Sequence, residues 1–437
     1  MQKQVLADRT ISRTLSSLGL VGLALAIVAF LPLGLLANSL LIPMDDTQTD
    51  HLKAYGIVYR ALEKEHKCEW LLNYRAGSFL IEESQDVIDG CLLAGVKYEE
   101  IGAEQVADIY RQIEVENMER VELQKAPRVA VYSPPNHRPW DDAVMLALNY
   151  AEIPYTVVWD QEVLAGKLEE YDWLHCHHED FTGQYGKFYA AFRNEPWYQS
   201  DVQTNEDMAK KLGYAKVSKM KLDVVKTIYD YVRRGGFLFS MCSAPETMDI
   251  ALAADGVDIV PREFDGDPVD PDAQSKLDFS KTFAFENFQV NLDPLAYRRS
   301  NIDTYPDRLI RFPAQQSDFF YLFEFSAKID PVPTMLVQDH VSTVNGFMGQ
   351  VSGFRKSLLK KAVIVLAQPD NFDEVRYIHG DLGRGTFTFY SGHDPEDYQH
   401  MVNNPPTDLS LYKNSPGYRL ILNNVLFPAA KKKERKT

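Results

Sequence analysis

Hydrophobic residues follow two spacings along the chain, and their alternation predicts a protein built from strands and helices. Before residue 125 the pattern predicts short apolar strands and amphipathic helices. These segments are residues 40–43 (strand), 51–64 (helix), 68–74 (strand) and a Glu- and Ala-rich stretch with helical spacing at 85–124. Lys125-Ala126-Pro127 then predicts a joint, so we expect a small N-terminal α/β unit over residues 40–125.

From residue 128 the alternation becomes regular. Predicted strands cover 129–132, 155–159, 171–175 and 236–241, predicted helices cover 140–150, 221–233 and 246–254, and the pattern returns at 361–366, 376–379, 386–390 and 417–426. Apolar strands that alternate with helices are typical of α/β proteins with a mostly parallel, doubly wound sheet covered on both faces. We therefore expect one domain over residues 126–430, with its ligand site at the carboxyl ends of the strands.

Residues 262–330 break this pattern, and we expect an insertion or a strand-rich cap there. The segment is rich in Asp and in aromatic residues. Its run at 319–323 (FFYLF) is typical of core, although aromatic side chains above a polar rim also suit a sugar. The aspartates of residues 265–272 predict a solvated acidic turn, with weak calcium binding as the alternative, because their spacing is not that of an EF-hand.

The first residues have the pattern of an export signal. Lys3, Arg9 and Arg13 precede residues 18–37, which contain no charged side chain. This length just suffices to span a bilayer, while the small triplet at 37–39 fits a signal peptide cleaved after Ser39, which we favour. If residues 1–39 are cleaved as a signal peptide, we expect the body of the chain in the periplasm. If they stay as an anchor, we expect it to be attached to the inner membrane and to face the periplasm. Contact with the membrane is expected only through this segment, if it is uncleaved.

The net charge of −16 restricts the partners that the protein can bind. A surface with this field repels phosphate backbones, so we expect no nucleic-acid partner. The basic tail at 431–437 is typical of a solvated chain end. With 45% hydrophobic residues and no internal repeat, the chain is neither disordered as a whole nor a solenoid.

Four cysteines stand at positions 68, 91, 176 and 242. Disulfides persist outside the cytoplasm, and a bridge between Cys68 and Cys91 is plausible. Sequence alone cannot choose among the three possible connectivities. Cys176 and Cys242 both lie in segments that carry candidate chemistry.

Residues 235–247 (GGFLFSMCSAPET) predict a strand that turns sharply at Cys242 into a helix. This turn resembles the nucleophile position of class I glutamine amidotransferase-like proteins, within them ThuA-like (trehalose-utilisation) domains, whose late Gly-x-Gly strand ending in Gly-His is matched by residues 383–393. From 41–47 through 171–186 to 416–420, the chain resembles exported bacterial proteins, chiefly from Bacteroidetes, labelled asparagine synthetase B. The resemblance implies a doubly wound α/β fold with flavodoxin-like layering.

Synthetase motifs do not support that label. Glutamine-dependent asparagine synthetases need a cysteine at the mature N-terminus and a Ser-Gly-Gly-x-Asp-Ser loop for pyrophosphate, and this chain has neither. They also need ATP, which is not available to an exported domain. We therefore do not expect ATP-dependent asparagine synthesis.

The amidotransferase resemblance implies a cysteine-dependent amide hydrolase. Cys242 would be the nucleophile, His393 the general base, and Glu396 or Asp394 the residue that orients the base. The run at 393–396 (HDPE) has one residue more than His-Pro-Glu, and the turn at Cys242 lacks the family's glycines. Without them an oxyanion hole has less room, so a buried core cysteine is the alternative.

A histidine-rich segment, HCHHED at 175–180, ends the third predicted strand of the main domain. Alternation places His175 and His177 on one face, where they could bind zinc with Asp180 and with His137 or His393. The other interpretation is that these side chains bond to loop backbone and shape the rim of a pocket. The candidate pocket residues are His137, His175, His177, His178, Glu179 and Asp180.

Three functions are therefore open. The first is a cysteine-dependent amide hydrolase, and the second is a non-catalytic protein that binds a sugar or a metal in the same pocket. Both predict a small-molecule substrate or sugar as partner, with zinc or calcium as the candidate cofactor. The third is an envelope interaction protein that docks a partner through the insertion, which predicts an exposed apolar patch away from the strand ends.

Overall fold

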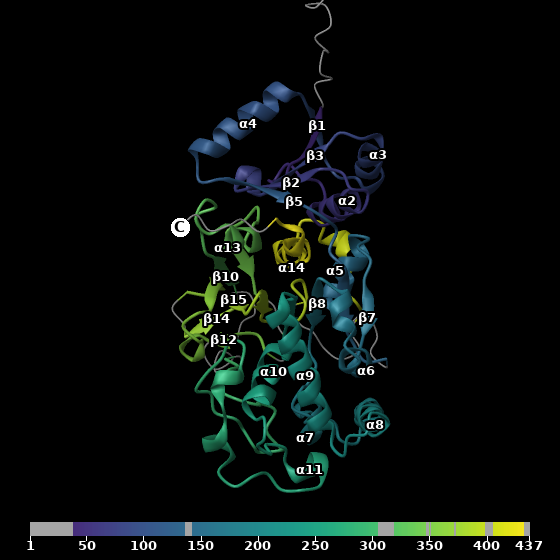
Figure 1. Cartoon of the computed structure of the whole chain (residues 1–437), viewed down its shortest axis with the longest axis vertical. Coiled ribbons are helices and arrows are strands. Elements are labelled where there is room, and N and C mark those ends of the chain that lie inside the picture. Colours follow the sequence, from purple (N-terminus) through teal and green to yellow (C-terminus); the bar gives the residue numbers. More distant parts are fainter. Residues whose placement is uncertain are drawn as a thin grey trace, which may run out of the picture.

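The computed structural model describes residues 38–135, 142–304, 319–346, 349, 351–370, 373–397 and 405–431. The expected export segment, apart from Asn38 and Ser39, and the basic tail beyond Lys431 lie outside these residues. Among the helices that are described, none is long and apolar enough to cross a membrane. The chain forms two main sheets, and the sheet of the N-terminal unit lies at one end of the molecule (Figure 1).

The N-terminal unit has an antiparallel sheet of order β4-β1-β3-β2-β5. Its elements are β1 (Ser39–Ile42), α2 (His51–Glu63), β2 (Cys68–Leu72), β3 (Ser78–Glu82), α3 (Gln85–Ala94), β4 (Glu99–Ile101), α4 (Ala103–Val115) and β5 (Glu119–Leu123). The stretch expected to be helical at 85–124 therefore contains two strands as well. In β5 the buried Val121 and Leu123 alternate with exposed Glu and Arg, which is strand spacing concealed by a Glu-rich composition.

The large sheet has nine strands in the order β11-β10-β13-β15-β16-β9-β8-β6-β7. Its strands are β6 (Val129–Tyr132), β7 (Thr156–Val158), β8 (Trp173–Cys176), β9 (Phe237–Met241), β10 (Phe319–Leu322), β11 (Thr343–Asn345), β13 (Ile364–Gln368), β15 (Tyr377–Leu382) and β16 (Gly385–Tyr390). The strands from β7 to β16 in this order pair in parallel, and those from β16 to β11 pair antiparallel. The sheet is therefore mixed, because the hairpin from β15 to β16 reverses the chain at Gly383, whose φ is +63°.

Helices cover both faces of the large sheet. Alternate side chains of β9 enter different cores, Phe237 and Phe239 one of them and Leu238 the other. The first core holds α5 (Ala143–Tyr150), α13 (Pro331–Leu336) and α14 (Pro416–Leu426), and the second holds α6 (Asp160–Leu164), α9 (Val217–Arg234) and α10 (Ala244–Ala253). The first core continues into the N-terminal unit, where buried Arg419 of α14 donates a hydrogen bond to the Met44 carbonyl at 2.8 Å.

The segment expected to be an insertion or a strand-rich cap divides into two parts. Within residues 262–304, which the structure describes, there are α11 (Arg262–Asp265), short 3-10 turns and isolated bridges, so this part is not strand-rich. The aromatic run at 319–323 instead begins β10 of the large sheet. Phe320 there is fully buried and Phe319 is 37% exposed, since alternate residues face opposite sides of a strand.

The acidic loop expected to be a solvated turn or a weak calcium site carries its own cation. The Lys216 ammonium lies 2.8 Å from Asp258, 3.0 Å from Asp265 and 2.5 Å from Asp267. Burial opposes the charge on Lys216, but the carboxylates outweigh it and raise the pKa. A protein ammonium therefore supplies the positive charge that calcium would bring.

The bridge considered between Cys68 and Cys91 is absent. All four cysteines lie in described residues, and each is buried without a disulfide bond. Cys68 and Cys91 pack as small apolar side chains in the core around α2. Burial raises the pKa of each thiol to about 12, so these two cysteines are structural.

We expect acid to destabilise the fold through His51, at the start of α2. Its ring nitrogens lie 2.9 Å from Asn414 Oδ1 and 2.9 Å from the Met44 carbonyl, and it stacks on His340. Burial, and then the charge of Arg419, lower its pKa to about 4. Because the unfolded chain keeps an ordinary pKa near ~6.5, it binds more protons between these values, and stability falls as the pH drops through this window.

The expected loss from His51 is up to roughly 3 kcal/mol between pH 7 and pH 4. Urea unfolding across this range measures it in the wild type and in His51→Gln, which cannot titrate. We expect a flatter pH profile for the variant. Equal slopes for the two proteins would show that His51 does not contribute.

Candidate metal centre

Three segments meet at the carboxyl edge of β8, β9 and β16, where the sequence places the functional site. The loop after β8 is fastened to the turn after β9 by hydrogen bonds to successive carbonyls. These bonds run from the Ala244 amide to His177 (3.0 Å), from Ser243 Oγ to His178 (3.0 Å) and from Thr247 Oγ1 to Glu179 (2.8 Å). The histidines of this loop are therefore held on a rigid support.

Asp142 connects helix α5 to these histidines. Its Oδ1 caps the helix by accepting from the amides of Val144 (2.8 Å) and Met145 (3.1 Å). The same carboxylate lies 3.3 Å from His175 Nε2 and 3.3 Å from His177 Nδ1. Burial opposes ionisation of Asp142, but the two histidines outweigh it and hold its pKa well below the usual range.

His177, His178 and His393 form a compact cluster, which we call the histidine trio. One ring nitrogen of each lies within 4.8 Å of those of the other two. The ring centroids are 4.4 Å apart for His177 and His393 and 5.0 Å apart for His177 and His178. His177 is fully buried, His393 is 5% exposed and His178 is partly exposed, so the trio is closed on most sides.

His177 is oriented as a metal ligand would be. Its Nδ1 faces Asp142, which favours the tautomer with the proton on Nδ1 and the lone pair on Nε2. Within the described part of the chain, both ring nitrogens are buried without a hydrogen bond, and Nδ1 has only its 3.3 Å contact with Asp142. A metal ion bound to Nε2 would give this buried nitrogen a partner.

The spacing of the trio suits a zinc ion. Zn–N bonds of about 2.0 Å in a tetrahedron place the ligand nitrogens about 3.3 Å apart. The nitrogens of the trio lie within 4.8 Å of one another, so binding would need them to approach by at most about 1.5 Å. Imidazole nitrogen is a preferred ligand of zinc and its transition-metal neighbours.

The other expected ligands, His175 and Asp180, have protein partners. His175 Nδ1 lies 3.1 Å from the Phe239 carbonyl, and Nε2 faces Asp142. Asp180 accepts from Thr182, from the Gly186 amide and, at 3.4 Å, from buried Arg299 of the insertion. The structure keeps the expected pair His175 and His177 together, because one ring nitrogen of each and an oxygen of Asp142 lie within 4.8 Å of one another. Asp180, the third expected ligand, is bound by other partners.

Glu179 belongs to the same loop. Its Oε2 accepts a hydrogen bond from the His177 amide at 2.8 Å. Burial, with the nearby Asp142 carboxylate adding to it, raises the pKa of Glu179 to about 7. His137, the remaining expected pocket residue, lies outside the described residues.

The sharp turn expected at Cys242 is present. Cys242 has a φ of +53°, in the left-handed region that non-glycine residues seldom adopt, and it is fully buried. Its amide donates to the Tyr390 carbonyl at 3.2 Å, and the Ala244 amide donates to His177. These two amides are therefore not available to an oxyanion hole.

The expected base and orienting residues lie at the end of β16. Asp394 Oδ1 accepts from the Glu396 amide at 2.9 Å, and Asp394 is buried while Glu396 is half-buried. Burial, together with the carboxylates of Asp394, Glu396 and Asp142, raises the pKa of buried Tyr418 well above its usual value. Acidic side chains from two loops therefore surround this hydroxyl of α14.

Sequence reasoning assigned no functional role to Asp142 or Tyr418. Asp142 falls within the helix predicted at 140–150, whereas in the structure it is the N-cap residue that precedes α5. Its position after the first strand of the sheet was the signal that could have indicated more, because such loops meet at one edge. Tyr418 carries no such signal, since the sequence places it only inside the last helix.

Comparisons with known proteins do not identify a family. No protein-family model matches the chain. No curated protein matches it either. Among solved structures, the cytoplasmic protein STM3548 from Salmonella typhimurium aligns with a TM-score of 0.33 and 10% identity, over 70% of this chain and 100% of that chain. The cytoplasmic protein STM1381 from Salmonella typhimurium LT2 aligns with a TM-score of 0.32 and 11% identity, over the same shares. No family is assigned from similarities at this level.

Proposed function

We propose that the protein is a metal-dependent hydrolase whose metal ion is held by His177, His178 and His393. The observation that carries the proposal is the histidine trio itself, with ring nitrogens that all lie within 4.8 Å. Asp142 supports it, because a carboxylate behind a ligating histidine fixes the ring and strengthens the ligand. Zinc is the best match to an all-imidazole set.

Hydrolysis is supported by the number of ligands, which is three among the described residues. Structural zinc sites are closed by four protein ligands, whereas catalytic sites have three and leave a position for water or substrate. A bound metal ion lowers the pKa of such a water and makes it a nucleophile near neutral pH. The position of the trio at the carboxyl edge of the parallel strands also supports a reactive site.

The fold family, the location and the partner of the protein are part of the same proposal. The left-handed turn from β9 to α10 supports a class I glutamine amidotransferase-like domain of the ThuA-like kind. The apolar segment at 18–37 supports an exported, periplasmic protein. Such a site fits a small polar molecule as its partner. The net charge of −16 argues against a nucleic-acid partner.

Metal removal and reloading test the function. We expect the mature protein to bind one Zn²⁺ per chain, to hydrolyse a chromogenic ester or amide, and to lose that activity to a chelator until Zn²⁺ is restored. Co²⁺ should give the visible absorption of a tetrahedral site. His178→Ala should lose both signals, while His66→Ala, at a histidine paired with Asp86 far along the chain from the trio, should keep them. Stoichiometric metal without any metal-dependent hydrolysis across a substrate panel would overturn the hydrolase and leave a metal-binding protein.

A thiol hydrolase is the second candidate, favoured by one observation. Met241 and Tyr390 are paired across β9 and β16, so Cys242 and the segment leading to His393 leave the sheet side by side. Iodoacetamide labelling followed by peptide mass spectrometry separates the candidates. With metal chemistry we expect buried Cys242 to label only after unfolding. Labelling of the folded protein well below pH ~8.5 that His393→Ala abolishes would favour the thiol.

A further inference from the structure

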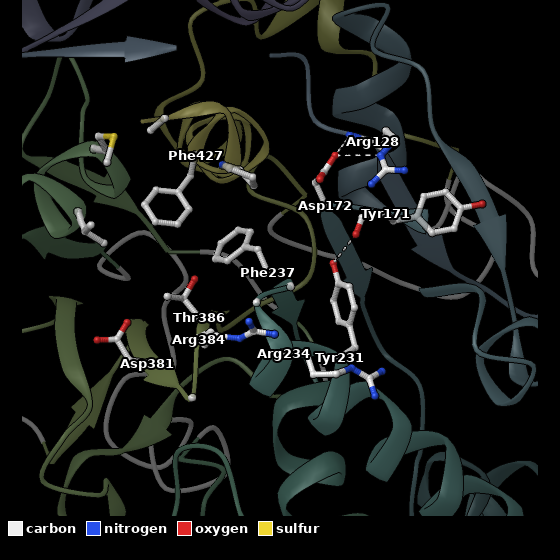
Figure 2. Close-up of a pocket in the computed structure, with 18 of the residues that line it drawn as sticks. Arg128, Tyr171, Asp172, Tyr231, Arg234, Phe237, Asp381, Arg384, Thr386 and Phe427 are labelled. Carbon is white, nitrogen blue, oxygen red and sulfur yellow. Dashed lines mark hydrogen bonds and ion pairs between the residues drawn. The ribbon is translucent and has the colours of Figure 1, made fainter. Parts of the chain in front are cut away.

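A cavity of about 760 Å³ opens at the amino edge of the large sheet, at the opposite ends of the strands from the histidine trio (Figure 2). The first residues of β9 and β16 line it, together with α13 and the turn that follows α14. Its volume lies in the range of about 300–1,000 Å³ that is usual for small-molecule sites. Neither the proposed metal centre nor the sequence patterns account for it.

One wall of this cavity is apolar. Phe237 and Phe427 face each other with ring centroids 5.1 Å apart, and Met335 and Val332 of α13 line the same cavity. Figure 2 shows the rings of Phe237 and Phe427 on the side of the cavity toward the last helix. This wall suits an aromatic ring or an alkyl chain.

The remaining lining is charged, with an excess of cations. It contains Arg128, Arg234, Arg384 and Lys431 against Glu169, Asp172 and Asp381. The lining therefore has one net positive charge, on a chain with a net charge of −16. Arg128 pairs with Asp172 at 3.2 Å and Arg234 pairs with Glu169 at 3.2 Å, and the side chains of the two arginines stay 59% and 53% exposed. Exposed pairs of this kind are weak, so a ligand anion can compete for the guanidinium groups.

Nearby negative groups are already engaged. Asp172 is bound by Lys125 at 2.7 Å and by Arg128 at 3.2 Å. The last carbonyls of α9 accept from backbone amides, Tyr231 from Gly236 at 3.1 Å, Val232 from Gly235 at 2.9 Å and Arg233 from Arg384 at 3.0 Å. The negative end of the helix is thereby capped, so it does not oppose an anion beside the arginines.

We propose that this cavity binds a small amphipathic anion, in which a carboxylate, sulfonate or phosphate is attached to an apolar ring or chain. The anionic group would lie against the arginines, whose planar guanidinium groups bind such oxygens in pairs. The apolar part would lie against Phe237, Phe427 and Met335. This cavity is a second binding site, separate from the metal centre.

The probe is 8-anilinonaphthalene-1-sulfonate, which combines an aromatic body with an anion and fluoresces in apolar surroundings. We expect saturable binding of one molecule per chain to the folded mature protein, with displacement by decanoate but not by decanol. Arg234→Gln combined with Arg384→Gln should weaken binding at least about tenfold. Arg193→Gln, a control at an arginine that stacks on Tyr189, should not change it.

Two further results decide the proposal. Val332→Trp should fill the cavity and abolish saturable binding, and a chelator should leave binding unchanged, which separates this site from the metal centre. Equal displacement by decanol, or unchanged binding in the folded arginine double variant, would overturn the proposal. If Val332→Trp does not fold, the arginine double variant and the competition experiment still test the proposal. The double variant changes only exposed side chains, and the competition experiment changes only the ligand.

Discussion

Replacing His177 by alanine is expected to weaken zinc binding at least about 100-fold, because the variant loses the ligand that the Asp142 carboxylate orients. His177 is the central residue of the site, since its Nδ1 faces Asp142 and it belongs to the trio with His178 and His393. Competition with a chromogenic zinc chelator at constant pH measures the affinity. The wild type and His66→Ala serve as references.

Asp142→Asn separates orientation from ligation. Asparagine keeps a side-chain oxygen that can cap α5 but removes the negative charge behind the histidines. We expect this variant to fold and to bind zinc about 10–100-fold more weakly. An affinity of His177→Ala equal to that of the wild type would exclude the trio as the metal site, and an unchanged Asp142→Asn would exclude the orienting role alone.

The second large effect concerns stability. Lys221 of α9 donates to Asp160 at 2.8 and 3.0 Å and to Tyr132 at 3.0 Å, and Asp160 also accepts from the Tyr132 hydroxyl. The side chains of Lys221 and Asp160 are 6% and 0% exposed. Removing one partner of such a buried pair leaves a charge that neither water nor protein compensates.

We therefore expect Lys221→Met to lower the free energy of unfolding by about 3–5 kcal/mol. Urea unfolding at pH 7 measures this loss. The double variant Lys221→Met with Asp160→Asn should recover much of it, because no buried charge is left. A loss below about 1 kcal/mol in the single variant would mean that water reaches Asp160.

The sequence predicts most parallel strands because their apolar runs are continuous. The segments at 129–132 and 236–241 match β6 and β9 closely, and the turn at Cys242 follows from the apolar run that ends there. The antiparallel half of the sheet was harder to predict. Strands such as β13 and β15 have the same apolar character as parallel ones, and only pairing in space decides their direction.

The sequence predicts where the site lies in the fold better than it predicts which side chains contact one another there. Strand order and the carboxyl-edge rule bring the segment at 175–180 close to His393 without any knowledge of side chains. Which nitrogens converge depends on contacts distant in sequence. Arg299 of the insertion engages Asp180, and Phe239 engages His175, so neither partner is visible from local spacing.

X-ray absorption spectroscopy at the zinc edge, including the extended fine structure, tests the central claim most directly when zinc is bound to the full-length protein. Our account predicts one zinc ion per chain with three imidazole nitrogens at about 2.0 Å and a light atom from water in the fourth position. His178→Ala should remove one imidazole contribution or the metal itself. A protein that binds no zinc after reloading, or a spectrum dominated by sulfur ligands, would contradict the account.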